Sequence, residues 1–246
     1  MSKHPPSFKS VIKKVGRKPA VLASQNALRH YSETFSKETA HWLRELCIAR
    51  RFAARVMTPE EPIGTVYGKK SLDVGAVDDR GYLVLDFSIK TFNFRDRKTG
   101  NYRHNFTGRF YELLGEELDL RRSYRFATLI ALIFLPSDSV EDGAPSSFAL
   151  AVKQFSKIVR LPNEAPQSAS FDHVFIALHG SDGQLSLFDA AHTPPIGGMP
   201  LAPELLTIDQ VLSTVAATVK LRSTDLRLDS CPRVREYRFG PDRRTA

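Results

Sequence analysis

Cysteine is scarce in this chain, and long apolar runs are absent. Only Cys47 and Cys231 occur among 246 residues, far apart and without CxxC spacing. This argues against a zinc site or a disulfide framework and fits a reducing cytoplasm. No apolar run approaches the roughly 20 residues of a membrane-spanning helix, and the N-terminus lacks the apolar segment of a secretory signal. We therefore expect a cytoplasmic protein without a membrane partner.

Several catalytic and nucleotide-binding motifs are missing as well. The seven histidines show neither HxxxH nor His–Cys ligand spacing, which disfavours zinc and haem. There is no GxxxxGK[ST], no GxGxxG after a strand and no GxSxG. Nucleotide binding of the common kinds and serine-hydrolase chemistry are unsupported.

Positive charge is in excess. The chain has 35 Lys and Arg against 27 Asp and Glu, a net charge of +8. This balance favours a polyanionic partner such as nucleic acid, although many basic proteins bind none. An apolar fraction of 42% and a charged fraction of 25% are typical of a globular protein with a substantial core.

Periodicity and breaker residues predict four parts. Residues 1–35 form a basic N-terminal arm, residues 36–161 a core, residues 162–221 a C-terminal ββα extension of the same domain, and residues 222–246 a basic tail. In the core we expect a helix from Ser36 to about Met57, strands over 63–67, 71–77 and 82–90, a helix over 107–122, a buried strand over 127–135 and a helix to Arg160. The extension has strands over 171–178 and 185–189 and a helix over 207–220.

The stretch from residue 71 to residue 90 is the centre of the chain. Its second strand alternates, which places Leu83, Leu85, Phe87 and Ile89 on one face and Asp86, Ser88 and Lys90 on the other. With a two-residue hairpin loop, Asp73 lies opposite Asp86 and diagonal to Ser88. Two carboxylates attract a hard divalent cation, and a lysine beside them can hold a water or a phosphate oxygen. These parts suit phosphodiester hydrolysis; the alternative is an ordinary hairpin with a solvated polar face.

An aspartate on one strand, followed on the next by an acidic-x-lysine triplet, resembles the PD-(D/E)xK superfamily of restriction-endonuclease-like proteins. Asp73 matches the first aspartate and Lys90 the lysine, whereas Ser88 stands where an acid is expected. The run Ser-Ile-Lys-Thr is similar to a bacterial branch with serine at this position. The resemblance covers roughly residues 37–136. It implies an α/β fold with a restriction-endonuclease-like αβββαβ core, a mixed sheet flanked by helices.

The resemblance also implies Mg²⁺, or Mn²⁺, ligated by Asp73. Asp86, which shares the strand face of Ser88, or a nearby backbone carbonyl would complete the site. Lys90 would hold the attacking water or the scissile phosphate, and Ser88 would hydrogen-bond a water at the metal. The opening helix contributes Glu45 as a candidate, with a surface salt bridge as the alternative. Three residues at the next helix would orient Lys90 or hold a phosphate: Asn105, Arg109 and Glu112. The alternative for the last two is an intrahelical ion pair.

The basic loop over 93–104 has interleaved aromatics and lies just beyond the lysine strand. Cations there can contact phosphates, and Phe94 or Tyr102 can stack on a base or sugar. The nucleic-acid-binding candidates are Arg95, Arg97, Lys98, Tyr102 and Arg103. An exposed charged loop without a ligand is the alternative.

Together these features predict a Mg²⁺-dependent DNA endonuclease in bacterial restriction or phage defence. The second hypothesis is a catalytically inactive nuclease-like subunit that binds nucleic acid or acts as a scaffold, which Ser88 favours. RNA is a third possible substrate. The expected partners are DNA, other subunits of a defence system and, if both strands of a duplex are cut, a second copy of the chain in a symmetric homodimer.

Overall fold

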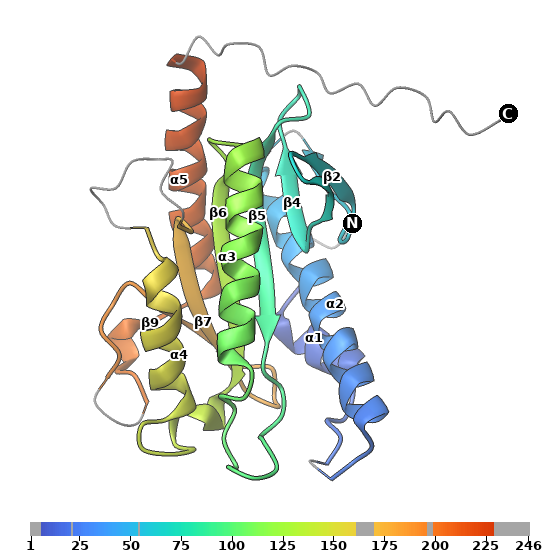
Figure 1. Ribbon diagram of the computed structural model, residues 1–246, viewed down its shortest axis with the longest axis vertical. Coiled ribbons are helices and arrows are strands. Elements are labelled where there is room, and N and C mark those ends of the chain that lie inside the picture. The colour runs from blue at the N-terminus through green and yellow to red at the C-terminus, as the bar shows by residue number, and fades with distance from the viewer. Residues whose placement is uncertain (1–5, 21, 54, 161–169, 196–198, 229–246) are drawn as a thin grey trace, which may run out of the picture.

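A seven-stranded mixed sheet forms the centre of the protein, with helices on both faces (Figure 1). The computed structural model describes residues 6–20, 22–53, 55–160, 170–195 and 199–228, with side chains up to residue 222. The strand order is β1-β4-β5-β6-β7-β8-β9. Helices α3 and α4 cover one face of the sheet, and α1, α2 and α5 cover the other. The predicted α/β class, with a mixed sheet flanked by helices, is confirmed.

Three parallel strands make the middle of the sheet: β5 (Leu83–Thr91), β6 (Thr128–Pro136) and β7 (His173–His179). Parallel neighbours need long crossovers, and these run through α3 (Phe106–Ser123) and α4 (Ser147–Phe155). Every residue of β6 is buried, because its two faces meet the two helical layers. The unbroken apolar run over 127–135 predicts this strand correctly.

Antiparallel strands complete both edges. On one side β4 (Val74–Val77) pairs with β5, and β1 (Arg55–Val56) pairs with β4. On the other side β8 (Leu185–Asp189) pairs with β7, and β9 (Leu205–Leu206) pairs with β8. The strand expected over 63–67 is β2 (Pro62–Thr65), which pairs with β3 (Gly68–Ser71) in a separate two-stranded sheet. The prediction that the strand over 63–67 belongs to the main sheet is therefore wrong.

The N-terminal region is folded onto the core. Helix α1 (Phe8–Val15) buries Phe8 and Val11, and Trp42 Nε1 donates a hydrogen bond to the Pro6 carbonyl at 2.8 Å. Helix α2 (Gln25–Arg50) begins well before Ser36, because Ser24 accepts a hydrogen bond from the Ala27 amide. Over the described residues from Pro6 onward, the expected basic N-terminal arm is therefore not separate from the core.

The other helix ends also differ from the expected ones. Arg51 takes a left-handed conformation with φ 53°, which ends α2 before Met57. Helix α4 is followed by a short 3₁₀ helix, η2 (Ser156–Ile158). The described residues include two more 3₁₀ helices, η1 (Ser137–Val140) and η3 (Ala202–Glu204). Helix α5 (Ile208–Leu228) continues past residue 220. The predicted tail thus begins inside a helix, and residues 229–246 lie outside the described ones.

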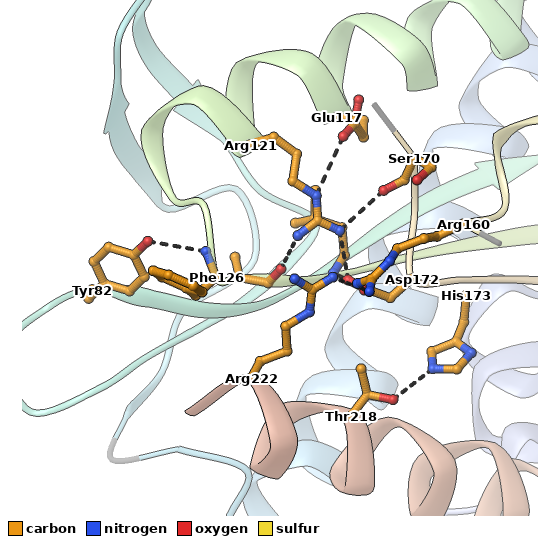
Figure 2. A network of polar contacts seen from close by, with 12 residues as sticks. Tyr82, Glu117, Arg121, Phe126, Arg160, Ser170, Asp172, His173, Thr218 and Arg222 are labelled. Atoms are coloured by element: carbon orange, nitrogen blue, oxygen red, sulfur yellow. Dashed lines mark hydrogen bonds and ion pairs between the residues drawn. The ribbon is translucent and has the colours of Figure 1, made fainter. Parts of the chain in front are cut away.

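A buried ion cluster joins the two helical layers through the sheet (Figure 2). Asp172, just before β7, accepts hydrogen bonds from Arg121 of α3 at 2.7 Å, from Arg160 at 3.2 Å and from Arg222 of α5. The Leu129 amide donates to the same carboxylate at 2.9 Å. Arg121 Nε also lies 3.5 Å from Glu117 Oε1. The pKa of Asp172 is lowered because the effect of its burial is outweighed by Arg121 and Arg222.

Among the described residues, no helix combines the length and apolarity that crossing a membrane requires.

Candidate active site

The central hairpin has a register two residues away from the expected one. Val74 lies opposite Phe87 and Gly75 opposite Asp86, with a bulge between Ala76 and Val77. Asp73, the residue before β4, therefore faces Ser88 and not Asp86, and its Oδ2 accepts a hydrogen bond from the Ile89 amide at 2.7 Å. A shift of two residues keeps each side chain on its face, so Asp73 stays beside the polar face of β5.

The bulge also moves Leu83 away from its expected face. Leu83 packs in the core under α3 and α4, whereas Leu85, Phe87 and Ile89 pack in the core under α1, α2 and α5. From Leu85 onward the predicted alternation is found, because the ladder is regular there.

The polar face of β5 meets helix α3 and the hairpin β2–β3. Six side chains gather there, which we call the polar cluster: Lys70, Asp73, Asp86, Ser88, Lys90 and Glu116. They line a small pocket of about 180 Å³, to which Ser36 of α2 and Arg109 of α3 also contribute. The opening exists because β4 begins at Val74, so the end of β5 lacks an antiparallel neighbour on this side.

Asp86 is the most buried charged group of the polar cluster. Its exposure is 1%, Ser88 Oγ donates a hydrogen bond to its Oδ2 at 3.1 Å, and its Oδ1 has no hydrogen-bond partner among the described residues. Burial, followed by the negative charges of Glu116 and Asp73, raises the pKa of Asp86 to about 8. A buried carboxyl group with an unpaired oxygen is costly for folding and is a feature of functional sites.

Ion pairs hold the lysines of the polar cluster. Lys90 Nζ lies 2.9 Å from Glu116 Oε1 and 3.8 Å from Glu112 Oε2, and Lys70 Nζ lies 3.7 Å from Glu116. Burial also raises the pKa of Asp73, opposed by the Ile89 amide and Lys90. Two lysines and three carboxyl groups therefore share one site, in which each is buried or partly buried.

The supporting candidates are divided between this site and the surface. Arg109 lines the small pocket and pairs with Glu112 at 2.6 Å, and Glu112 reaches Lys90 as stated above. Asn105 is at the start of α3, with φ 67°, and lines a second hollow beside the small pocket. Glu45 is exposed, pairs with Arg44 at 2.9 Å and is not among the described residues that line either pocket.

The loop over 93–104 is less open than expected. Tyr102 is 2% exposed and Phe94 is buried as well, so their expected stacking on a base or sugar is contradicted in this conformation. Tyr102 donates to Asp138 at 2.9 Å, and Arg95 pairs with Asp138 at 2.8 Å above the Tyr102 ring. The apolar rings are needed to close the core at the end of β5.

The other cations of this loop are at the surface. Arg97 donates to the Ala23 carbonyl at 2.8 Å, and Lys98 and Arg103 are exposed. These three residues lie in the loop that leads into the start of α3.

The described residues include no group of three or more His, Cys, Asp and Glu side chains arranged to hold a metal ion. Any metal at the polar cluster must therefore take part of its ligands from water or substrate, which is usual for Mg²⁺.

Sequence reasoning missed Lys70 and the role of Glu116. The spacing of Arg109, Glu112 and Glu116 does predict a shared face of α3, and Arg109 and Glu116 both line the small pocket. That this face meets Lys90 depends on how α3 crosses the sheet. Lys70 comes from the separate hairpin, and no pattern in the chain links it to β5.

Comparisons of the chain with protein-family models, with curated proteins and with solved structures find no match. The resemblance to PD-(D/E)xK nucleases thus stays a prediction, which the geometry of the polar cluster must support by itself.

Proposed function

We propose that this protein is a metal-dependent nuclease that hydrolyses phosphodiester bonds in DNA, with the polar cluster as its active site. One observation carries the proposal: Asp73, Asp86 and Lys90 meet in one small pocket with a second lysine and a glutamate. Such a set neutralises a phosphate and binds a hard cation, and an ordinary solvated hairpin has no need to bury it.

The oxygen donors fit Mg²⁺ or Mn²⁺. Asp86 Oδ1 is buried without a partner among the described residues, and Asp73, just before the neighbouring strand β4, is near enough to raise the pKa of Asp86. Mg²⁺ is commonly held by one or two carboxylates together with waters and substrate phosphates, so these two aspartates would hold it. A cation bound there supplies Lewis-acid activation of the phosphodiester and of a water.

The residues of the chain have separate tasks in this proposal. Lys90 and Lys70 face the pocket and balance the charge of the phosphate, while Glu116 holds their ammonium groups in place before substrate binds. Ser88 fixes the orientation of the Asp86 carboxyl group. Because the pKa of Asp86 is about 8, Asp86 is protonated at neutral pH without a cation, and metal binding should release this proton.

The order of elements gives further support by analogy. Helix α2, strand β1, the hairpin β4–β5, helix α3 and the parallel strand β6 occur in this order, with the separate hairpin β2–β3 inserted between β1 and β4. Apart from that insertion, this is similar to the αβββαβ order of restriction-endonuclease-like proteins. From that resemblance we propose a role in bacterial restriction or phage defence, with DNA and other subunits of a defence system as partners.

Cleavage of supercoiled plasmid tests the proposal. The wild type is incubated with Mg²⁺ or Mn²⁺ and compared with Asp73→Ala and Lys90→Ala, with Asp209→Ala and Lys157→Ala as exposed controls of the same residue types. We expect nicking or linearisation by the wild type and both controls, and none by the two pocket variants or with EDTA. Equal cleavage by all five proteins would refute the assignment of the site.

A second candidate is an inactive nuclease-like subunit that binds nucleic acid or serves as a scaffold. The pairing of Lys90 with Glu116 favours it, because the lysine is already neutralised. A wild type that cuts nothing but shifts DNA to the same extent as Asp73→Ala and Lys90→Ala would select this second function.

A further inference from the structure

We infer that the hollow beside the polar cluster receives the base and sugar of one unpaired nucleotide, so that the substrate is single-stranded DNA or a duplex with an unpaired nucleotide at the cleavage point. This inference rests on the proposed function and names the substrate class of the same site. It concerns residues of α2 and of the end of β5 that the nuclease chemistry does not use.

The hollow adjoins the small pocket. Its volume is about 390 Å³, and α2 bounds it on one side while the end of β5 and the loop before α3 bound it on the other. The two cavities share four lining residues: Ser36, Asp73, Thr91 and Arg109. A strand whose phosphate lies at the polar cluster therefore has the adjoining nucleoside at the hollow.

Neutral hydrogen-bonding groups from α2 and β5 line part of the hollow. Asn93 Nδ2 donates to Ser32 Oγ at 3.4 Å and to Thr91 Oγ1 at 3.3 Å, and Ser36 Oγ lies 3.3 Å from Thr91 Oγ1. Asn93 is 3% exposed, and its Oδ1 has no partner among the described residues. An unpaired buried amide oxygen is destabilising unless a ligand donates to it, and base amino groups are such donors.

Two imidazole rings belong to the walls, His41 from α2 and His104 from the loop before α3. Single-stranded bases are commonly held by stacking on aromatic or histidine side chains together with hydrogen bonds to their edges. The hollow provides both kinds of contact, whereas Tyr102 of the loop, the stacking residue expected from the sequence, is buried.

The size of the hollow excludes a duplex. A cube of the same volume, about 390 Å³, has edges of roughly 7 Å. A B-DNA duplex is wider than its own major groove, which is about 12 Å wide, so the whole duplex is too wide for the hollow. The volume lies near the lower end of the range for pockets that bind small organic ligands. One nucleoside fits, and a base must leave its pair to enter.

Charge places the base, and not the phosphate, inside the hollow. The hollow is lined by two glutamates, Glu33 and Glu60, and by one lysine, Lys37, so acidic groups outnumber basic ones there; Glu33 is paired with Arg29 at 2.6 Å. Arg109 stands where the two cavities join. The phosphate is therefore attracted to the junction and the small pocket, and the uncharged base is left for the neutral part of the hollow.

Fluorescence anisotropy tests the inference without requiring cleavage. Three labelled DNA probes of one sequence are compared in EDTA: a single strand, a blunt duplex, and the duplex with a one-nucleotide bulge. We expect the wild type to bind the first and third about tenfold more tightly than the blunt duplex, a difference of about 1.4 kcal/mol, since they present a base that can stack and form hydrogen bonds in the hollow.

Two variants test whether the preference arises in the hollow. Ser213→Ala, at an exposed position of α5 that lines neither pocket in the described part of the chain, is the control and should keep the preference. His104→Ala changes an exposed loop residue, so it tests the wall without disturbing the core; Asn93→Ala tests the amide. Both should reduce the preference to about threefold or less and leave binding of the blunt duplex unchanged. A thermal melt of each variant verifies that it is folded.

The outcomes separate this inference from the proposed nuclease activity. A wild type that cleaves plasmid but binds all three probes equally refutes the inference and leaves the nuclease proposal intact. A wild type that cleaves neither plasmid nor the single-stranded and bulged probes with Mg²⁺ or Mn²⁺, yet shows the preference, lost in His104→Ala, supports the inference and refutes the nuclease activity. Equal weakening of all three probes by the variants, or no binding of any probe, overturns the inference.

Discussion

Replacement of Asp86 by asparagine should make the protein more stable at neutral pH. The Asp86 carboxyl group is 1% exposed and has a pKa of about 8, against about 3.9 in an unfolded chain. Between these two values the folded state binds the proton that the unfolded state has lost, so stability falls as pH rises. At pH 7 this difference destabilises the fold by about 4 kcal/mol, because each unit of pKa corresponds to about 1.4 kcal/mol.

Asparagine has nearly the same shape and no charge at any pH. Its amide can still accept the hydrogen bond from Ser88, but its NH₂ group then occupies the place of an oxygen that has no partner among the described residues. An unsatisfied buried donor costs about 1–3 kcal/mol. The expected net gain for Asp86→Asn at pH 7 is therefore about 1–3 kcal/mol.

Urea unfolding in EDTA at pH 5, 6, 7 and 7.5 measures this effect. The difference between Asp86→Asn and the wild type should grow by about 1.4 kcal/mol or less per pH unit, whereas the exposed control Asp209→Asn should show no such trend. A difference that is constant over this range would show that Asp86 is ionised in the folded protein and would refute the reasoning. When the series is repeated with Mg²⁺ in place of EDTA, Mg²⁺ should stabilise the wild type more than Asp86→Asn.

Three other groups give predictions of the same kind. Asp172→Ala removes the carboxylate that the buried Arg121 and Arg222 share and should destabilise the protein by about 3–5 kcal/mol in urea unfolding. Glu33→Ala, at an exposed ion pair, should change stability by less than about 1 kcal/mol. An equal effect of the two substitutions would contradict the burial argument. Burial lowers the pKa of His179 to about 4, so the wild type should lose stability as pH falls from about 6.5 to about 4; His179→Leu should lose less over that range, and identical pH profiles would refute this. Burial raises the pKa of the Cys47 thiol to about 12, so in Cys231→Ala this thiol should react with Ellman's reagent only as fast as the protein unfolds, and a rapid reaction in native buffer would show that it is accessible.

Local patterns predict the central elements well because their causes are local. Alternation places Asp86, Ser88 and Lys90 on one face of β5, and the unbroken apolar run predicts the buried strand β6. Even with a wrong register Asp73 is placed on the correct side, since the error is two residues and the period of a strand is two. The bulge that moves Leu83 to the other face has no signal in the sequence.

Contacts between distant segments are what the sequence does not reveal. The first half of α2 is mostly polar, so its apolar stripe only becomes recognisable beyond Ser36. That half is held by two aromatic residues, Tyr31 against Phe94 and Phe35 against Phe8 of α1. Glu116 meets Lys90 because α3 crosses the sheet at a particular angle, and Tyr102 is buried because the loop folds back toward Asp138. Each depends on tertiary packing, which overrides local preference.

The position of α1 has a consequence for synthesis on the ribosome. The Phe8 ring packs against Phe134, with centroids 5.8 Å apart, and lies 6.2 Å from His179. His179 follows Phe8 by roughly 170 residues, and at about 5–20 residues per second it is made about 10–35 s later. During that interval the sheet that covers the aromatic side chains of α1 and α2 is incomplete. Nascent chains should therefore expose an apolar surface that can associate non-specifically with other molecules. Among the described helices, α1 is thus made before the others and is buried late.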